Sequence, residues 1–208
     1  MVEQARVFLI DDDPSVLRAL ERFLRSSGFR VDVFTSPAAF LERQPYTEGP
    51  GCLLLDLRMP GVSGLDLQQI MGQQGISMPI VFLSAQADVP SAARAMREGA
   101  IDFLVKPVDG PQLLESISRA TALAVDLWHR SRAEEEVARR LARLTTRERQ
   151  VCDLVARGLL NKQIAYELGT SEKTVKVHRG RVMRKLEVES VAALVRLLLQ
   201  ISPPETSH

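Results

Sequence analysis

The chain has few of the residues that build disulfides or histidine- and cysteine-based metal sites. Its 208 residues include two cysteines, Cys52 and Cys152, and three histidines, His129, His178 and His208. Both cysteines lie in apolar stretches without metal-ligand spacing, so we expect buried, reduced thiols in a cytoplasmic protein. The histidines have no companions at the spacing of a metal site or catalytic triad. These absences argue against metal or nucleophilic catalysis that depends on histidine.

Long hydrophobic runs are missing as well. Hydrophobic residues make up 45% of the chain, yet no run approaches the roughly 18 apolar residues that a membrane-spanning helix needs. The apolar patch near the amino terminus is short and soon becomes acidic, which is untypical of a signal peptide. We therefore expect no membrane association, and enough apolar side chains for a packed core.

Charge is distributed unevenly along the sequence. Residues 1–120 contain 11 lysines and arginines against 15 acidic residues, whereas residues 121–208 contain 16 against 11. The net charge is therefore −4 in the first part and +5 in the second, although the whole chain carries only +1. An acidic part followed by a basic part predicts two domains with different partners, of which nucleic acid suits the second.

Polar side chains in the first part follow short apolar runs. Four such runs end in the acidic run Asp11–Asp13, in Asp56, in Ser84 and in Lys106. Apolar runs of this length are typical of buried strands in a parallel sheet, and the carboxyl ends of such strands meet at one edge. Phe29 to Phe34 is a further expected strand. Because these strands alternate with helical patterns, the sequence predicts a five-stranded α/β domain of the flavodoxin-like type.

The acidic residues at this edge have two interpretations. If the acidic run lies beside Asp56, the carboxylates repel one another unless a cation separates them, and Mg²⁺ suits such oxygen ligands. Alternatively, the acidic run only caps the helix that begins at Pro14, and we expect one of its aspartates to do so in any case. A cation and Lys106 could together neutralise a phosphoryl group transferred to Asp56, and Ser84 could donate a hydrogen bond to it.

The order of these residues resembles the receiver domain of two-component response regulators, over about the first 120 residues. This resemblance implies that Asp56 accepts a phosphoryl group and that Lys106 contacts it. Ser84 and Phe103 match the switch residues of that family, whose hydroxyl and aromatic ring change position on activation. The peptide bond before Pro107 matches one that is often cis in the family.

The same resemblance implies a magnesium site, in which Mn²⁺ could substitute. Asp12 matches the more direct carboxylate ligand, and Asp11 matches the one that acts mainly through water. Asp56 itself and the backbone carbonyl of Arg58 complete the protein ligands that the family pattern implies. The receiver domain is expected to span residues 1–122.

The segment after Pro111 contains no helix breaker up to about Leu141. Apolar residues recur there at near-helical spacing, and opposite charges three to five residues apart follow them, which suits a solvated helix. We predict one long helix over residues 111–142 that begins as the last receiver helix and continues as the linker. Leu127 and Trp128 could belong to the core or could line a dimer interface.

The remaining sequence predicts a bundle of four helices, followed by a disordered tail at residues 202–208. The expected N-caps of the first three are Thr145 or Thr146 with Glu148, Asn161, and Thr170 or Ser171. The third helix follows a turn at Gly169 and is rich in lysine and arginine. This arrangement is typical of a helix-turn-helix domain, although a basic helix face can also be merely solvated.

The pattern Leu-Thr-x-Arg-Glu, Asn-Lys-x-Ile-Ala and Thr-Val-Lys-x-His between Leu144 and Leu186 resembles the LuxR-type DNA-binding domain, which we place at residues 143–201. A receiver followed by this domain is similar to the NarL/FixJ family of response regulators, and the helical linker favours its FixJ branch. The expected DNA-contacting residues are Lys173, Thr174, Lys176, Val177, Arg179, Arg181, Arg184 and Lys185.

The resemblance implies a transcription regulator that a partner histidine kinase phosphorylates on Asp56. Phosphorylation would favour a homodimer, two recognition helices would bind a double-stranded DNA operator, and RNA polymerase is a further partner compatible with this function. Such a protein is no enzyme apart from the chemistry at Asp56. One alternative is a magnesium-dependent phosphohydrolase, which would need a second aspartate where Arg58 stands. Another is a DNA-binding protein with a degenerate receiver, against which the intact set of site residues argues.

Overall fold

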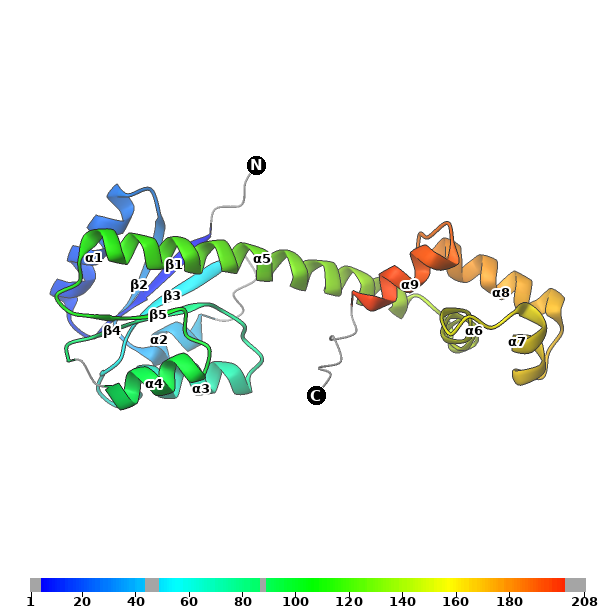
Figure 1. Ribbon diagram of the computed structural model, residues 1–208, viewed down its shortest axis with the longest axis horizontal. Coiled ribbons are helices and arrows are strands. Elements are labelled where there is room, and N and C mark those ends of the chain that lie inside the picture. Colours follow the sequence, from blue (N-terminus) through cyan, green and yellow to red (C-terminus); the bar gives the residue numbers. More distant parts are fainter. Residues whose placement is uncertain (1–4, 44–48, 87–88, 201–208) are drawn as a thin grey trace. The chain divides into compact units, whose positions relative to one another are not determined.

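The computed structural model describes residues 5–43, 49–86 and 89–200. The chain divides into two compact units, residues 1–129 and residues 130–208. The first unit contains a parallel sheet covered by helices, and the second is built from helices (Figure 1). Among the described residues, none of the helices is long and apolar enough to cross a membrane.

The sheet of the first unit has five parallel strands. They are β1 (Arg6–Ile10), β2 (Arg30–Phe34), β3 (Gly51–Asp56), β4 (Ile80–Ser84) and β5 (Asp102–Val105). Their order across the sheet is β2-β1-β3-β4-β5, which confirms the predicted flavodoxin-like fold. Strands β3 and β4 are buried along their whole length, which explains why their sequences are uninterrupted apolar runs.

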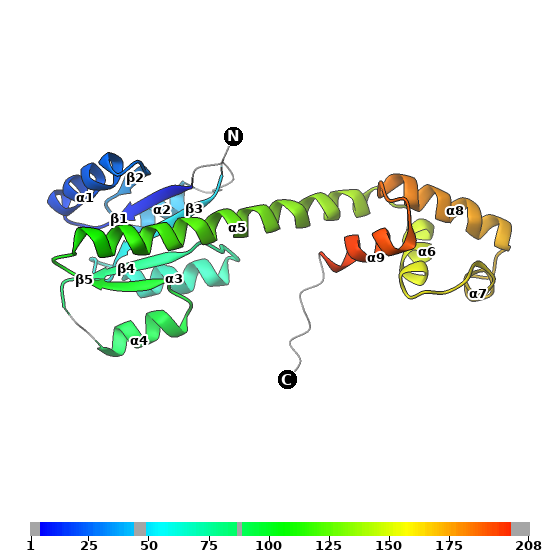
Figure 2. The ribbon, with the colours of Figure 1, turned by 45° about the horizontal axis from the view of Figure 1, so that its top comes forward.

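Helices cover both faces of this sheet (Figures 1 and 2). Helix α1 (Pro14–Ser26) and the first part of α5 (Gly110–Ala142) lie on one face, and α2 (Pro37–Glu42), α3 (Gly64–Gln73) and α4 (Val89–Arg97) lie on the other. Because side chains alternate along a strand, Leu54 packs in the core under α1 and α5, whereas Leu53 and Leu55 pack under α2, α3 and α4.

Side chains cap the first two helices, and the cap expected from the acidic run is confirmed. The Asp13 carboxylate accepts a hydrogen bond from the backbone N–H of Ser15 (2.7 Å), so Asp13 is the member of the acidic run that caps α1. Ser36 caps α2 in the same way. Since Asp13 serves this purpose, Asp11 and Asp12 remain available for other contacts.

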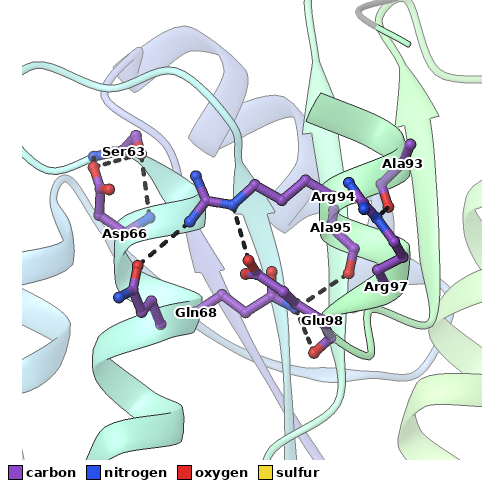
Figure 3. Close-up of polar contacts among 9 residues, drawn as sticks. Ser63, Asp66, Gln68, Ala93, Arg94, Ala95, Arg97 and Glu98 are labelled. Carbon is purple, nitrogen blue, oxygen red and sulfur yellow. Dashed lines mark hydrogen bonds and ion pairs between the residues drawn. The ribbon is translucent and has the colours of Figure 1, made fainter. Parts of the chain in front are cut away.

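Helices α3 and α4 are joined by polar contacts at the carboxyl end of α4 (Figure 3). The Gln68 side chain is buried, and its Nε2 donates to the backbone carbonyls of Ala95 (3.4 Å) and Glu98 (3.1 Å). Gln68 Oε1 has no hydrogen-bond partner among the described residues. Nearby, Arg94 pairs with Glu98 (2.8 Å) and donates to the side chain of Gln69 (3.4 Å). Gln68 thus adds a side-chain donor to the last turn of a neighbouring helix, where the Ala95 carbonyl also accepts the Ala100 N–H (3.0 Å).

The predicted long helix is present as α5, which runs for 33 residues from Gly110 to Ala142. Its first turns carry Leu113, Ile117 and Ala120 into the core of the first unit. Its last turns belong to the second unit, where Val137 and Leu141 are buried. Leu127 and Trp128, near the division between the units, are each half-buried.

The second unit contains the end of α5 together with α6 (Thr146–Ala156), α7 (Asn161–Glu167), α8 (Glu172–Lys185) and α9 (Val191–Leu199). Thr145 caps α6 and forms a capping box with Glu148, and Ser171 caps α8, as predicted. The two thiols are buried, and burial raises the pKa of Cys52 to about 12 and that of Cys152 to about 11. The tail predicted to be disordered, residues 202–208, lies outside the described residues.

The predicted cap of α7 is wrong. Leu160 occupies the N-cap position, and its backbone N–H donates to Oε1 of Gln163 (2.7 Å). Asn161 is instead the first residue of the helix, and its side-chain oxygen accepts a hydrogen bond from Nη1 of Arg179 on α8 (3.0 Å). Because Gln163 already satisfies the first orphan N–H group, the Asn161 amide can bind a residue of the neighbouring helix.

Candidate functional sites

Polar residues predicted to share one edge of the sheet do so. Asp11 directly follows β1, Asp56 and Ser84 end β3 and β4, and Lys106 directly follows β5. The register pairs Ile10 with Leu55, so the next residues along the two strands, Asp11 and Asp56, are neighbours. This edge lies at the carboxyl ends of the parallel strands, where open α/β sheets place their binding sites.

The Lys106 ammonium contacts both buried carboxylates. Its Nζ lies 2.6 Å from Oδ2 of Asp11 and 2.5 Å from Oδ1 of Asp56. Asp11 and Asp56 expose only 1% and 6% of their surface. The remaining oxygens accept backbone N–H groups, from Asp13 to Asp11 (2.9 Å) and from Arg58 to Asp56 (2.8 Å). Two carboxylates thus share one ammonium, and the buried part of the site has an excess negative charge.

The pKa shifts at this site follow from burial and charge. Burial raises the pKa of Asp56, the neighbouring Asp11 charge adds to this effect, and the Lys106 contact opposes it. Burial alone would lower the pKa of Lys106, but its hydrogen bonds to Asp11 and Asp56 raise it above the ordinary value. The charged form of Lys106 is therefore stabilised, whereas the charged form of Asp56 is destabilised.

The donor set at this edge fits a hard divalent cation. Carboxylate oxygens of Asp11 and Asp56 both contact Lys106, so negative charge is in excess there. Asp12, the residue after Asp11, is exposed. In the described part of the chain, no three His, Cys, Asp or Glu side chains are already grouped as metal ligands. Lys106 contacts both buried carboxylates.

The predicted switch residues, Ser84 and Phe103, contact neighbouring residues rather than Asp56. The Ser84 hydroxyl donates to the backbone carbonyl of Gln86 (2.8 Å) and accepts from its N–H (3.3 Å). Phe103 is half-buried on β5, with its ring centroid 6.4 Å from that of Phe82. The peptide bond between Lys106 and Pro107 is cis, as the family resemblance suggested.

The residues predicted to contact DNA do not form one uniform surface on α8. Val175 and Val182 are buried, and we refer to them as the buried stripe of α8. Six of the eight predicted residues are exposed: Lys173, Thr174, Lys176, Val177, Arg181 and Arg184. The other two, Arg179 and Lys185, are half-buried and bind inside the unit.

Lys185 is bound to the start of α6. Its ammonium donates to Oε2 of Glu148 (2.6 Å) and to the backbone carbonyl of Arg143 (3.0 Å). Glu148 is only 2% exposed, and the Lys185 contact together with the Thr145 N–H lowers the pKa of Glu148 to about 2. Sequence reasoning identified Glu148 only as a capping residue, because nothing local marks a partner 37 residues away.

Comparison with known proteins identifies the family of each unit. The response regulator receiver domain family matches residues 7–118, and the luxR family of bacterial regulatory proteins matches residues 142–198. The chain is a response regulator of the NarL/FixJ family. This NarL/FixJ-type regulator is similar to the response regulator protein TmoT of Ectopseudomonas mendocina, with 43% identity over 195 residues that cover 94% of this chain and 88% of TmoT.

Other relatives agree with this assignment. The transcriptional regulatory protein FixJ of Azorhizobium caulinodans is 40% identical over 199 residues, which cover 96% of this chain and 94% of FixJ. Among solved structures, the response regulator StyR matches with a TM-score of 0.81 and 44% identity, over 95% of this chain and 99% of StyR. The predicted family, fold and general function as a DNA-binding transcription regulator are thus confirmed.

Proposed function

We propose that Asp56 is the phosphoacceptor of this response regulator and that a sensor histidine kinase is its phosphodonor. The observation that carries the proposal is the contact of Lys106 with both Asp11 and Asp56 at the carboxyl edge of the sheet. A nucleophilic carboxylate needs a nearby cation to reduce repulsion by an incoming phosphoryl group, and Lys106 supplies one. Burial also removes competing water from Asp56, whose pKa is raised by its surroundings.

Asp11, Asp12, Asp56 and the backbone carbonyl of Arg58 are the proposed ligands of Mg²⁺, for which Mn²⁺ could substitute. The bound ion would neutralise charge on the transferring phosphoryl group. The proposal is supported by the excess of carboxylates over ammonium groups at the buried part of the site. Asp12 is exposed, so its carboxylate can reach an ion at the mouth of the site without a large desolvation cost.

In the proposed transfer, a carboxylate oxygen of Asp56 forms a bond to phosphorus while the bond from phosphorus to the kinase imidazole nitrogen breaks. The imidazole leaves with the electron pair of that bond. Lys106 then holds an oxygen of the phosphoryl group in place of the Asp56 carboxylate. The Ser84 hydroxyl leaves the Gln86 carbonyl and donates to another phosphoryl oxygen, and the Phe103 ring moves inward into the space beside it.

The proposed output is a homodimer that binds a double-stranded DNA operator through two α8 helices, with RNA polymerase as a further partner. Lys173, Lys176, Arg181 and Arg184 are the proposed phosphate-contacting residues of each helix, and Thr174 and Val177 lie with them on its exposed surface. Arg179 and Lys185 serve first to attach α8 to α7 and α6. A dimer binds more tightly than a monomer because its second α8 helix binds at a high effective concentration.

The proposal is tested with acetyl phosphate and Mg²⁺ on the full chain. Wild-type protein should shift from monomer to dimer in sedimentation velocity and should gain affinity in a titration with a duplex selected from random DNA. Asp56→Asn should lose both responses while keeping its fold and weak DNA binding. Asp126→Asn, the same change at an exposed residue of α5, should respond like wild type.

Removal of Asp12 tests the metal ligands. Asp12→Ala should not be phosphorylated by acetyl phosphate in Mg²⁺, because the incoming charge loses its cation. Normal phosphorylation of this variant would contradict the assignment of the metal ligands. A phosphorylated wild-type protein that stays monomeric yet binds DNA tightly would contradict dimerisation as the route to DNA binding.

A further inference from the structure

Helix α8 contains a glycine that its own fold does not require. Gly180 lies inside the helix, with eight helical residues before it and five after it. A Cβ atom at this position would have no other atom within 4 Å, and the backbone has no unusual φ angle. Glycine in a helix interior is less stable than alanine, because it loses more chain entropy on folding. Neither packing nor backbone geometry within the unit explains the missing side chain.

Gly180 stands in the middle of the exposed basic face of α8. On a helix, residues three, four and seven positions apart share one face. Lys176 and Val177 lie four and three residues before Gly180, Lys173 lies seven before it, and Arg184 lies four after it; all four are exposed. The buried stripe of α8 occupies the opposite side of the helix. The missing side chain is therefore at the centre of the surface that faces away from the unit.

We infer that Gly180 marks the position at which DNA comes closest to α8, so that helix backbone rather than a side chain lies against the edges of the base pairs. This inference rests on the proposed role of α8 as the helix that enters the major groove. The groove is about 12 Å wide and a helix with its side chains is about 10–12 Å across, so the fit is already tight. A methyl group at the deepest point would move the helix outward.

The surrounding residues suit this arrangement. Lys173, Lys176 and Arg184 have long side chains that can extend past the helix toward the phosphates on either side of the groove. Val177 has a short apolar side chain that can contact a thymine methyl group. With a side chain at Gly180, these groups would all be held farther from the DNA. Gly180 thus sets how closely α8 approaches the base pairs, and it does so by the absence of a side chain.

The test is to add a single methyl group. Gly180→Ala should raise the Tm of the DNA-binding unit by about 3–6 °C. The same variant should bind the selected duplex about tenfold more weakly or worse, and Gly180→Leu should bind still more weakly. The salt dependence of binding should change less than it does in Lys176→Ala, because no phosphate-contacting side chain is removed. Stability and affinity then move in opposite directions, which an ordinary helix glycine would not produce.

A matched control exists in the receiver unit. Gly72 is also an exposed helical glycine with no atom within 4 Å of its Cβ position, and it lies in α3. Gly72→Ala should stabilise its own unit by a similar amount and leave DNA binding unchanged. Lys176→Ala, measured in the same titration, reports whether this face of α8 contacts DNA at all.

These variants separate the two ideas. If Lys176→Ala weakens binding and Gly180→Ala binds as tightly as wild type, the inference about Gly180 is wrong and α8 keeps its proposed role. If neither change affects binding, the proposed role of α8 fails, and the inference fails with it. A Gly180→Ala protein that is less stable than wild type would show that the glycine serves the fold, which also overturns the inference.

Discussion

Each unit contains a lysine bound to a buried carboxylate, and the two contacts are equally short. Lys106 lies 2.5 Å from Asp56 in the receiver unit, and Lys185 lies 2.6 Å from Glu148 in the DNA-binding unit. The pKa of the carboxylate nevertheless moves in opposite directions. Burial raises the pKa of Asp56, whereas the Lys185 hydrogen bond lowers the pKa of Glu148 to about 2.

The difference arises from what else surrounds each pair. Lys106 is shared between Asp56 and Asp11, so one positive charge faces two negative charges. Among the described residues, Lys185 pairs with one carboxylate, Glu148, which also accepts the Thr145 N–H (2.9 Å). The Lys185 pair is balanced, whereas the Lys106 group keeps one carboxylate charge in excess, as the proposed binding of a further cation or a phosphoryl group requires. A short distance between lysine and carboxylate therefore does not identify a role, whereas the charge balance around it does.

The largest expected effect is on the balanced pair. Lys185→Met should destabilise the DNA-binding unit by about 2–3 kcal/mol, because Glu148 is left buried without its ammonium; the partial exposure of Lys185 keeps the loss below that of a fully buried pair. Urea unfolding followed by circular dichroism measures this change. Lys173→Met, on the exposed face of the same helix, should change stability by less than about 0.5 kcal/mol. Equal losses in both variants would mean that the Glu148 contact contributes little.

Neutralising each carboxylate sharpens the comparison, because one change should stabilise its unit and the other should destabilise its unit. Asp56→Asn removes one of two charges that share Lys106, and should stabilise the receiver unit by about 1 kcal/mol. Glu148→Gln weakens a satisfied pair, and should destabilise the DNA-binding unit by about 1–2 kcal/mol. Thermal unfolding of the two variants beside wild type compares the signs directly. Destabilisation of the receiver by Asp56→Asn would show that its charges are balanced after all.

The smallest effect is the pH dependence of the Glu148 pair. The folded-state pKa of Glu148, about 2, lies below its ordinary value of 4.5. The stabilisation is therefore fully present above about pH 4.5 and is lost as the pH falls toward 2. The difference in unfolding free energy between wild type and Glu148→Gln should be constant near neutral pH and should shrink through this acid window. Urea unfolding at several pH values tests this, and a difference that persists at pH 2 would contradict it.

The sequence predicts the strand ends well because the signal is local. Apolar runs ending in Asp56 and Ser84 are buried strands, whereas only Leu104 is buried in the strand before Lys106. Their ends meet because a doubly wound sheet leaves few other arrangements. The orientation of Ser84 could not be predicted, because its hydrogen bonds with Gln86 depend on how the loop after β4 folds. A polar residue at the end of a strand is visible in sequence, but the direction of its side chain is not.

Long-range partners explain the other differences. Lys185 has the composition and helical position of a DNA-contacting residue, and only the fold brings Glu148 against it. Asn161 is a residue type that often caps helices. In the structure, however, the Gln163 side chain accepts the N–H at the start of α7, and the Asn161 side-chain oxygen accepts a hydrogen bond from Arg179. In both cases a residue with a plausible local role is used by a partner at least 18 residues away. Local sequence patterns cannot predict that a distant partner will bind the residue in place of its local role.

The Gln68 contacts have a mechanical consequence for α4. Helix α3 begins directly behind the end of β3, where the Gly64 N–H donates to the Leu57 carbonyl (3.0 Å), and Gln68 then fastens the carboxyl end of α4 to α3. A helix held at one end can move only by rotating about that end. Helix α4 has nine residues, a length of about 13 Å, so a swing of roughly 10° carries its amino end about 2 Å while the pinned end stays in place. Any rotation of α4 against α3 would therefore be centred near Gln68.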